Sequence, residues 1–150
     1  MNNIIGNSLV LLSLMTSLAT SFLFFKKNYS HYLKTYITSC IFCFFSFIFL
    51  IYCFVISDFY VSAVYQNSHT TKPLIYKIAG SWGNHEGSML LFICIIALYG
   101  FTFCYFSKNF DNKFKYLTVF FQNNLMMIFL IYLFFLSNPF DYVSSDPTQG

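Results

Sequence analysis

Four long apolar runs constrain this chain more than any other feature of its sequence. They cover roughly residues 4–25, 36–57, 88–106 and 117–136, and none contains Asp, Glu, Lys or Arg. A helix needs about 20 residues to cross a hydrocarbon core of about 30 Å. The runs lack the alternation of polar and apolar residues that barrel strands show. The sequence therefore predicts an all-α integral membrane protein, a single domain with four transmembrane helices, a long outer loop at 58–87 and an outer tail at 137–150.

The composition supports a chain that is solvated by lipid. Hydrophobic residues make up 57% of it and charged residues 9%, against roughly 25% charged residues in soluble domains. The eight basic residues are all lysines. Recognition of phosphates and bases relies strongly on the arginine fork, so we expect no nucleic-acid partner.

The lysines are distributed unevenly between the two sides of the predicted bundle. Short loops rich in lysine stay on the cytoplasmic side, or on the matrix side in a mitochondrion. We therefore expect the N-terminus, the 58–87 loop and the 137–150 tail to face outward from a bacterial inner membrane or a mitochondrial inner membrane. Six of the eight lysines lie in the two loops expected inside: Lys26, Lys27, Lys34, Lys108, Lys113 and Lys115.

The segment at the outer mouth of the third run is the richest in polar and aromatic chemistry. One interpretation is a helix start, in which Asn84 or Ser88 caps the helix and Glu86 lies near the positive end of its dipole. The other is a contact surface for a ligand or a second membrane subunit. The residues of this candidate contact surface are Trp82, Gly83, His85, Glu86, Gly87 and Ser88.

Two short motifs elsewhere suggest chemistry that their surroundings argue against. His85 and Glu86 begin the zinc-protease pattern HExxH, but Met89 replaces its second histidine, which excludes a zinc peptidase. Cys40 and Cys43 form a CxxC motif in an apolar run, with no histidine after it. Such thiols are expected to pack as small hydrophobic groups and not to attach haem.

Polar amides cluster near the start of the fourth run, at Gln122, Asn123 and Asn124. Unpaired amides are costly in lipid, so we expect them to bond to neighbouring helices or interfacial water. No histidine lies inside any of the four runs. The sequence therefore predicts no haem ligand within the bundle.

Several segments match a known family in order and at the right spacing. Residues 57–61 and 76–91, with the sequence Trp-Gly-Asn-His-Glu-Gly-Ser at 82–88, resemble the CcmF family of cytochrome c maturation proteins. Residues 5–9 resemble the start of that family, and residues 137–140 resemble its Ser-Asn-Pro-Phe segment. Phe92 stands where the family usually has Trp, and Lys77 where it often has Arg.

The resemblance implies a membrane subunit of a haem lyase complex, which attaches haem to apocytochrome c on the outer face. Haem would be handled by the complex and not ligated by this chain. The family's tryptophan-rich WWD motif and its haem-ligating histidines lie beyond the equivalent of Gly150. We therefore expect the chain to correspond to the N-terminal part of the family, as a split-gene subunit or a fragment. Its partners would be the remaining CcmF-like chain with the WWD motif, other maturation subunits and apocytochrome c.

Three alternatives to this function stay open. A paralogous family that matures nitrite-reductase cytochromes shares the same segments. A small four-helix channel or transporter would require ionisable groups or interrupted helices within the membrane, and the four runs contain neither. A purely structural assembly factor would carry the same sequence features as a haem lyase subunit.

Overall fold

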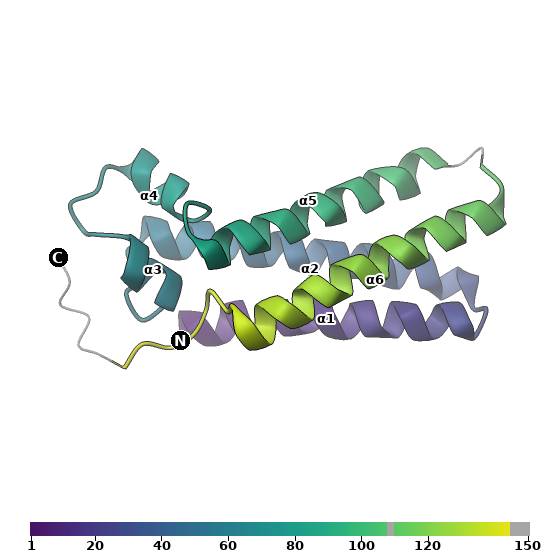
Figure 1. Cartoon of the computed structure of the whole chain (residues 1–150), viewed down its shortest axis with the longest axis horizontal. Coiled ribbons are helices and arrows are strands. Elements are labelled where there is room, and N and C mark those ends of the chain that lie inside the picture. The colour runs from purple at the N-terminus through teal and green to yellow at the C-terminus, as the bar shows by residue number, and fades with distance from the viewer. Residues whose placement is uncertain (108–109, 145–150) are drawn as a thin grey trace.

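Four long helices form an up-and-down bundle in the computed structural model (Figure 1). The structure describes residues 1–107 and 110–144, without the side chains of Tyr29 and Ser30, so Lys108 and the last part of the predicted tail lie outside the described residues. All four helices are long and apolar enough to cross a membrane, which confirms the predicted fold class. They are α1 (Asn2–Phe25), α2 (Tyr29–Val55), α5 (His85–Phe106) and α6 (Asn112–Leu136).

The helices extend beyond the apolar runs, mostly at their N-terminal ends. Helix α2 begins at Tyr29 and not near 36, and α6 begins at Asn112 and not near 117. The apolar runs mark the part of a helix that tolerates hydrocarbon, whereas the backbone hydrogen bonds continue through the polar residues beside it. Lys34, Lys113 and Lys115 are therefore helical residues and not loop residues.

Helices α1 and α2 end in the same way, with a residue in the left-handed conformation. Lys27 and Ser57 both have φ of 56°. The next amide in each case reaches back to the last turn, from Asn28 to the Leu23 carbonyl at 3.1 Å and from Asp58 to the Cys53 carbonyl at 3.0 Å. This bond is typical of the Schellman motif and stops the helix, which is why α2 ends at Val55.

Small residues allow the helices to approach closely. Helix α1 packs against α2 and α6, and α5 packs against the same two helices. Between α1 and α2, the Ser13 hydroxyl donates to the Ser39 carbonyl at 3.0 Å, and the Ser39 hydroxyl donates to the Ser13 carbonyl at 2.7 Å. Gly100 of α5 faces Tyr36 of α2 so closely that a Cβ there would overlap the phenol oxygen. Such contacts are typical of helix packing in membranes.

The amides of α6 bond to neighbouring helices, as predicted. Asn123 is fully buried; its amide nitrogen donates to the Ser17 carbonyl at 3.0 Å and the Ser21 hydroxyl at 2.9 Å, and its oxygen accepts from the Ser17 hydroxyl at 3.0 Å. Gln122 donates to the Ile96 carbonyl of α5 at 2.7 Å. One polar cluster therefore connects α6 to both helices beside it.

The cysteines pack inside the bundle. All five are free thiols, and Cys40, Cys43, Cys53 and Cys94 are buried. The thiol nearest to Cys43 is not its CxxC partner Cys40 but Cys94 of α5, at 3.4 Å between the sulfur atoms. The prediction that Cys40 and Cys43 pack as small hydrophobic groups is confirmed. The contact between Cys43 of α2 and Cys94 of α5 was not predicted from the sequence.

The predicted outer loop contains two short helices, α3 (Ser62–Asn67) and α4 (Leu74–Gly80). Both are too short to show a helical period in the sequence. The chain beyond α6 returns to this region, where the Ser62 amide donates to the Asp141 carbonyl at 2.9 Å and the Val143 amide donates to the Tyr60 carbonyl at 3.1 Å. The N-terminus, the α3–α4 region and the segment after α6 therefore lie at one end of the bundle (Figure 1).

Candidate functional site

The candidate contact surface begins at the N-terminus of α5, where Asn84 caps the helix. The Asn84 side-chain oxygen accepts from the Gly87 amide at 2.7 Å, and its amide nitrogen donates to the Gly80 carbonyl at 2.8 Å. Of the two capping residues predicted, the structure therefore selects Asn84. The Ser88 hydroxyl donates within the helix to the His85 carbonyl at 2.9 Å. Because Asn84 bonds in both directions, it joins the end of α4 to the start of α5.

Gly87 lies where the chain passes closest to itself. A Cβ on this residue would overlap the carbonyl oxygen of Ser81 and would lie only 2.9 Å from the Ser81 carbonyl carbon. A Cβ on Gly83 would instead lie 3.2 Å from the Ala79 carbonyl oxygen, which is tight but not an overlap. Close backbone approach thus constrains Gly87 strongly and Gly83 weakly.

The remaining side chains of the surface are accessible. Trp82 is 41% exposed, His85 and Ser88 are also exposed, and Glu86 is partly buried in the first turn of α5. Glu86 thus lies near the positive end of the helix dipole, as predicted. An accessible indole beside an imidazole and a carboxylate offers a stacking face and polar groups to a partner.

His85 connects this surface to the end of α6. Its Nδ1 lies 3.1 Å from the hydroxyl oxygen of Ser137, with the donor set by the imidazole tautomer. Next to Ser137, the Asn138 amide donates to the side-chain oxygen of Asn7 at 2.7 Å, and the Asn7 amide donates to the Phe140 carbonyl at 3.2 Å. Three segments far apart in the sequence therefore meet at one end of the bundle.

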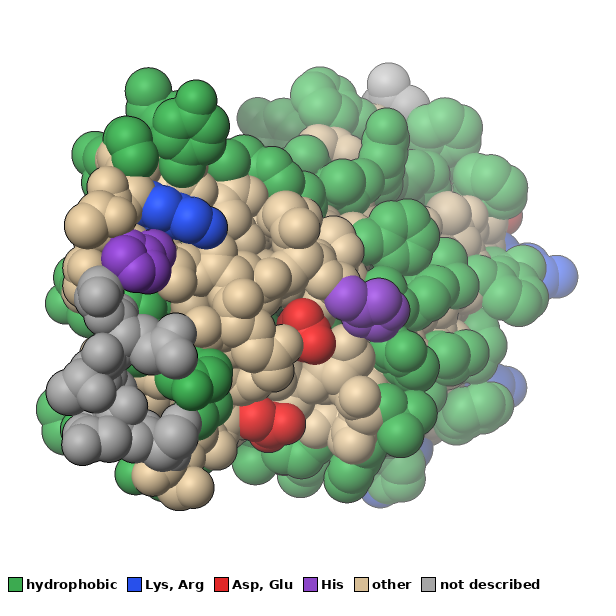
Figure 2. All heavy atoms as spheres, turned by 60° about the vertical axis from the view of Figure 1, so that its left-hand side comes forward, with side chains coloured by type: hydrophobic (Ala, Val, Ile, Leu, Met, Phe, Trp, Pro, Cys, Tyr) green, Lys and Arg blue, Asp and Glu red, His purple; other side chains and the backbone are tan. Residues whose placement is uncertain are grey.

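Figure 2 shows this end of the molecule from outside. Acidic and histidine side chains lie among polar atoms, and hydrophobic side chains border them (Figure 2). Within the described residues, no group of three His, Cys, Asp or Glu side chains is placed to hold a metal ion. This end of the bundle therefore presents a polar surface with a hydrophobic border (Figure 2).

Sequence reasoning did not assign Asn7, Ser137 and Asn138 to this surface. They belong to segments 5–9 and 137–140, which had been noted only as matches to the family pattern. The available signal was that all four segments that match the family pattern begin or end at a membrane boundary on the side predicted to face outward. Combined with the expected up-and-down topology, this placed them at the same end of the bundle.

The fold and this surface define a multi-pass, all-helical membrane protein with a structured polar surface at one end. Comparison with known proteins shows which proteins it resembles. The chain is 42% identical over 101 residues to cytochrome c-type biogenesis protein ccl1 of Rhodobacter capsulatus, which covers 67% of this chain and 16% of that protein. It is 42% identical over 105 residues to CycK of Bradyrhizobium diazoefficiens, covering 70% of this chain and 16% of CycK.

A solved structure of the cytochrome c haem lyase CcmF has the same fold. The two superpose with a TM-score of 0.82 at 21% identity, over 97% of this chain and 26% of the CcmF chain. No family model matches the sequence. The chain is similar to CcmF-related cytochrome c-type biogenesis proteins, as the resemblance implied, and it spans 16% of the length of the curated relatives just named.

Proposed function

We propose that this chain acts in cytochrome c maturation as a membrane component of a haem lyase system. The observation that carries the proposal is the 42% identity to two cytochrome c-type biogenesis proteins, over 67% and 70% of this chain. The CcmF-like fold supports it, since the chain follows that fold over 97% of its length.

Within that system the chain would help to shape the outer surface where haem meets apocytochrome c. Its partners would be a CcmF-like chain carrying the WWD motif and other maturation subunits. The exposed Trp82 and His85, together with the partly buried Glu86, would contact one of these partners or haem itself. The four long helices would hold this surface at a defined height above the membrane. Haem is then the cargo of the complex and not a group that this chain ligates.

The orientation proposed for the chain places the N-terminus and the contact surface outside. Lys26, Lys27, Lys34, Lys113 and Lys115 lie at the opposite end of the bundle, which is the cytoplasmic or matrix side by the positive-inside rule. The membrane would be the bacterial inner membrane or the mitochondrial inner membrane.

Complementation in a maturation-deficient host tests the function and the surface together. Trp82→Ala, His85→Ala and Glu86→Gln should each lower covalent haem on a reporter cytochrome c, while the chain remains present in the membrane. Truncation of an aromatic interface residue can cost about 2 kcal/mol or more of binding free energy, enough to weaken a transient assembly. His69→Ala is the matched control, because the His69 side chain is also exposed but bonds, among the described residues, only to Thr71, at 2.9 Å to its hydroxyl.

The result that contradicts the surface assignment is normal maturation in all three variants at normal abundance. Failure of the wild-type chain to support maturation with any partner would contradict the proposed function itself. A second candidate function is maturation of nitrite-reductase cytochromes, the alternative left open by the sequence. The cytochrome c-type biogenesis protein NrfE of Haemophilus influenzae is 31% identical to this chain over 101 residues. Reporter cytochromes from each class would distinguish the two.

A further inference from the structure

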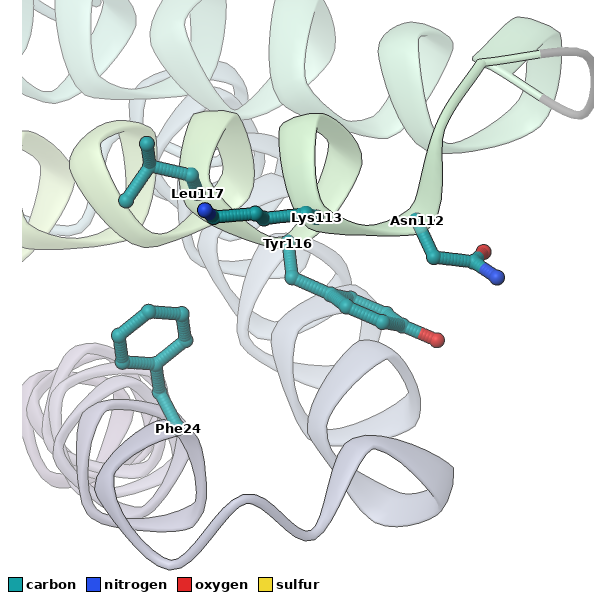
Figure 3. A pocket seen from close by; sticks show the side chains of 5 residues that line it. All are labelled: Phe24, Asn112, Lys113, Tyr116 and Leu117. Carbon is teal, nitrogen blue, oxygen red and sulfur yellow. The ribbon is translucent and has the colours of Figure 1, made fainter.

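A cavity of about 510 Å³ opens between the C-terminal end of α1 and the N-terminal end of α6, far from the surface just described (Figure 3). Phe24 comes from α1, and the other residues that line it come from the first turns of α6: Asn112, Lys113, Tyr116 and Leu117. We call it the α1–α6 cavity. Its volume falls in the range of roughly 300–1,000 Å³ that is typical of small-molecule sites.

The part of the cavity nearer the bundle centre is apolar and built from stacked rings. The Phe24 ring stacks on Phe120 with 4.2 Å between centroids. The Tyr116 ring meets Tyr32 edge-on at 6.1 Å. Leu117 completes this wall and is 44% exposed. The rings hold one another, so the apolar wall is formed before any ligand binds.

The polar part of the cavity contains a cation without a counter-ion. The Lys113 side chain runs along α6 toward Leu117, so its ammonium lies over the apolar wall (Figure 3). Among the described residues, Lys113 has no hydrogen-bond or ion-pair partner. An ammonium at the edge of hydrocarbon is costly unless it is paired or hydrated.

The surroundings of Lys113 favour an anion. Lys26, Lys27, Lys34 and Lys115 lie at the same end of the bundle, and Asp111 is the acidic residue at this end within the described part of the chain. Asp111 is exposed and makes no side-chain bond to the start of α6. The lysines therefore outnumber the carboxylate, and the local field attracts negative charge.

We infer that the α1–α6 cavity binds one anionic phospholipid. Its phosphate would pair with the Lys113 ammonium, Asn112 and Tyr116 would border the headgroup, and an acyl chain would lie over Phe24 and Leu117. A lipid fits better than a soluble anion because most of the wall is apolar and the cavity lies where the apolar runs 4–25 and 117–136 meet polar residues. Headgroups meet acyl chains at such a boundary. Basic sites at the inner ends of transmembrane helices commonly bind anionic headgroups.

Competitive lipid retention tests this inference. The full chain is purified in neutral detergent and given equal amounts of phosphatidylglycerol and phosphatidylcholine with identical acyl chains. Native mass spectrometry then counts the lipids retained. The wild type should retain one phosphatidylglycerol in preference to phosphatidylcholine, and Lys113→Gln should lower that retention about fivefold, as expected for one lysine near an anionic headgroup. Lys113→Arg should keep it.

Lys115→Gln is the matched control, because it removes the same charge two residues along α6, where the side chain lines a separate cavity with Leu33 and Phe101. Retention of phosphatidylglycerol by Lys115→Gln should stay within about twofold of wild type, since the lost charge does not line the α1–α6 cavity. An equal loss in both variants would mean only general attraction to anionic lipid and would overturn the site. Equal retention of both lipids, no retained lipid, or displacement by millimolar inorganic phosphate would overturn it as well. The last result would indicate a site for free anions.

Discussion

The imidazole Nδ1 of His85 lies 3.1 Å from the hydroxyl oxygen of Ser137, a residue 52 positions further along the chain. This bond joins the first turn of α5 to the residue that ends α6. It occupies one ring nitrogen and orients the imidazole, so the Nε2 nitrogen is the one left to meet a partner. His85 thus takes part in the structure and is also available for contact. The complementation result for His85→Ala must therefore be compared with the abundance of the chain in the membrane.

Gly87 should be the most sensitive glycine in the contact surface. Gly87→Ala forces a Cβ into the Ser81 carbonyl, and overpacking of this kind typically costs about 1–3 kcal/mol of stability. Gly83→Ala, with 3.2 Å available, should cost less than about 1 kcal/mol. Equilibrium unfolding in mixed micelles measures both. Equal losses would show that the close approach at Ser81 does not matter.

Asn123 should contribute more to the bundle than its neighbour Asn124. Asn123→Ala removes three bonds to Ser17 and Ser21 of α1, and hydrogen bonds between membrane helices average about 0.6 kcal/mol each, so a loss of about 2 kcal/mol is expected. The Asn124 amide nitrogen bonds within α6, at 2.7 Å to the Phe120 carbonyl, and its oxygen accepts one long bond from the Ser21 hydroxyl of α1, at 3.4 Å. With one weak bond to α1 in place of three, Asn124→Ala should cost less than half as much. The same unfolding assay compares them, and the reverse order would contradict this packing of α6 on α1.

Cys43 and Cys94 should cross-link in preference to Cys40 and Cys94. The Cys43 and Cys94 sulfur atoms are 3.4 Å apart, and a small side-chain adjustment brings them to disulfide distance. Variants that keep only one of these pairs are treated with a mild membrane-permeant oxidant, and peptide mapping reports the bond. Preferential bonding of the Cys40–Cys94 pair would mean that α2 is rotated relative to α5.

The orientation can be read from the accessibility of two exposed positions at opposite ends of the bundle. Thr70→Cys and Asn28→Cys, each in a cysteine-free background, place a thiol in the α3–α4 region and in the α1–α2 turn. Because positively charged loops stay inside, an impermeant maleimide added from outside should label position 70 and not position 28. Labelling only at position 28 would reverse the proposed topology.

The isolated chain should not hold haem stably. The middle of the bundle contains no histidine, and the exposed His69 and His85 are loop and surface residues. Purification after haem-replete expression should therefore give no stoichiometric Soret band. A stoichiometric band that disappears in His69→Ala or His85→Ala would show that this chain ligates haem itself.

The sequence predicted the helix boundaries less well than the number of helices, and the reason is physical. Hydrocarbon excludes charge, so four uncharged runs had to become four spans. Outside hydrocarbon that rule no longer applies, and α2 and α6 extend into polar residues that the runs omitted. Helices α3 and α4 were missed because six or seven residues carry no readable period.

Capping could be predicted because it is local: Asn84 and Gly87 are three residues apart, and an asparagine before an apolar run is a common helix start. The sequence by itself thus determined the membrane environment and the number of spans, and it limited the cap of α5 to Asn84 or Ser88, of which the structure selects Asn84. Only the tertiary structure decided that Asn7, His85 and Ser137 gather at one end and that Cys43 faces Cys94. Those contacts depend on how each helix is rotated about its axis. Rotation is set by packing against neighbours, because large apolar side chains occur at both buried and exposed positions of the helices.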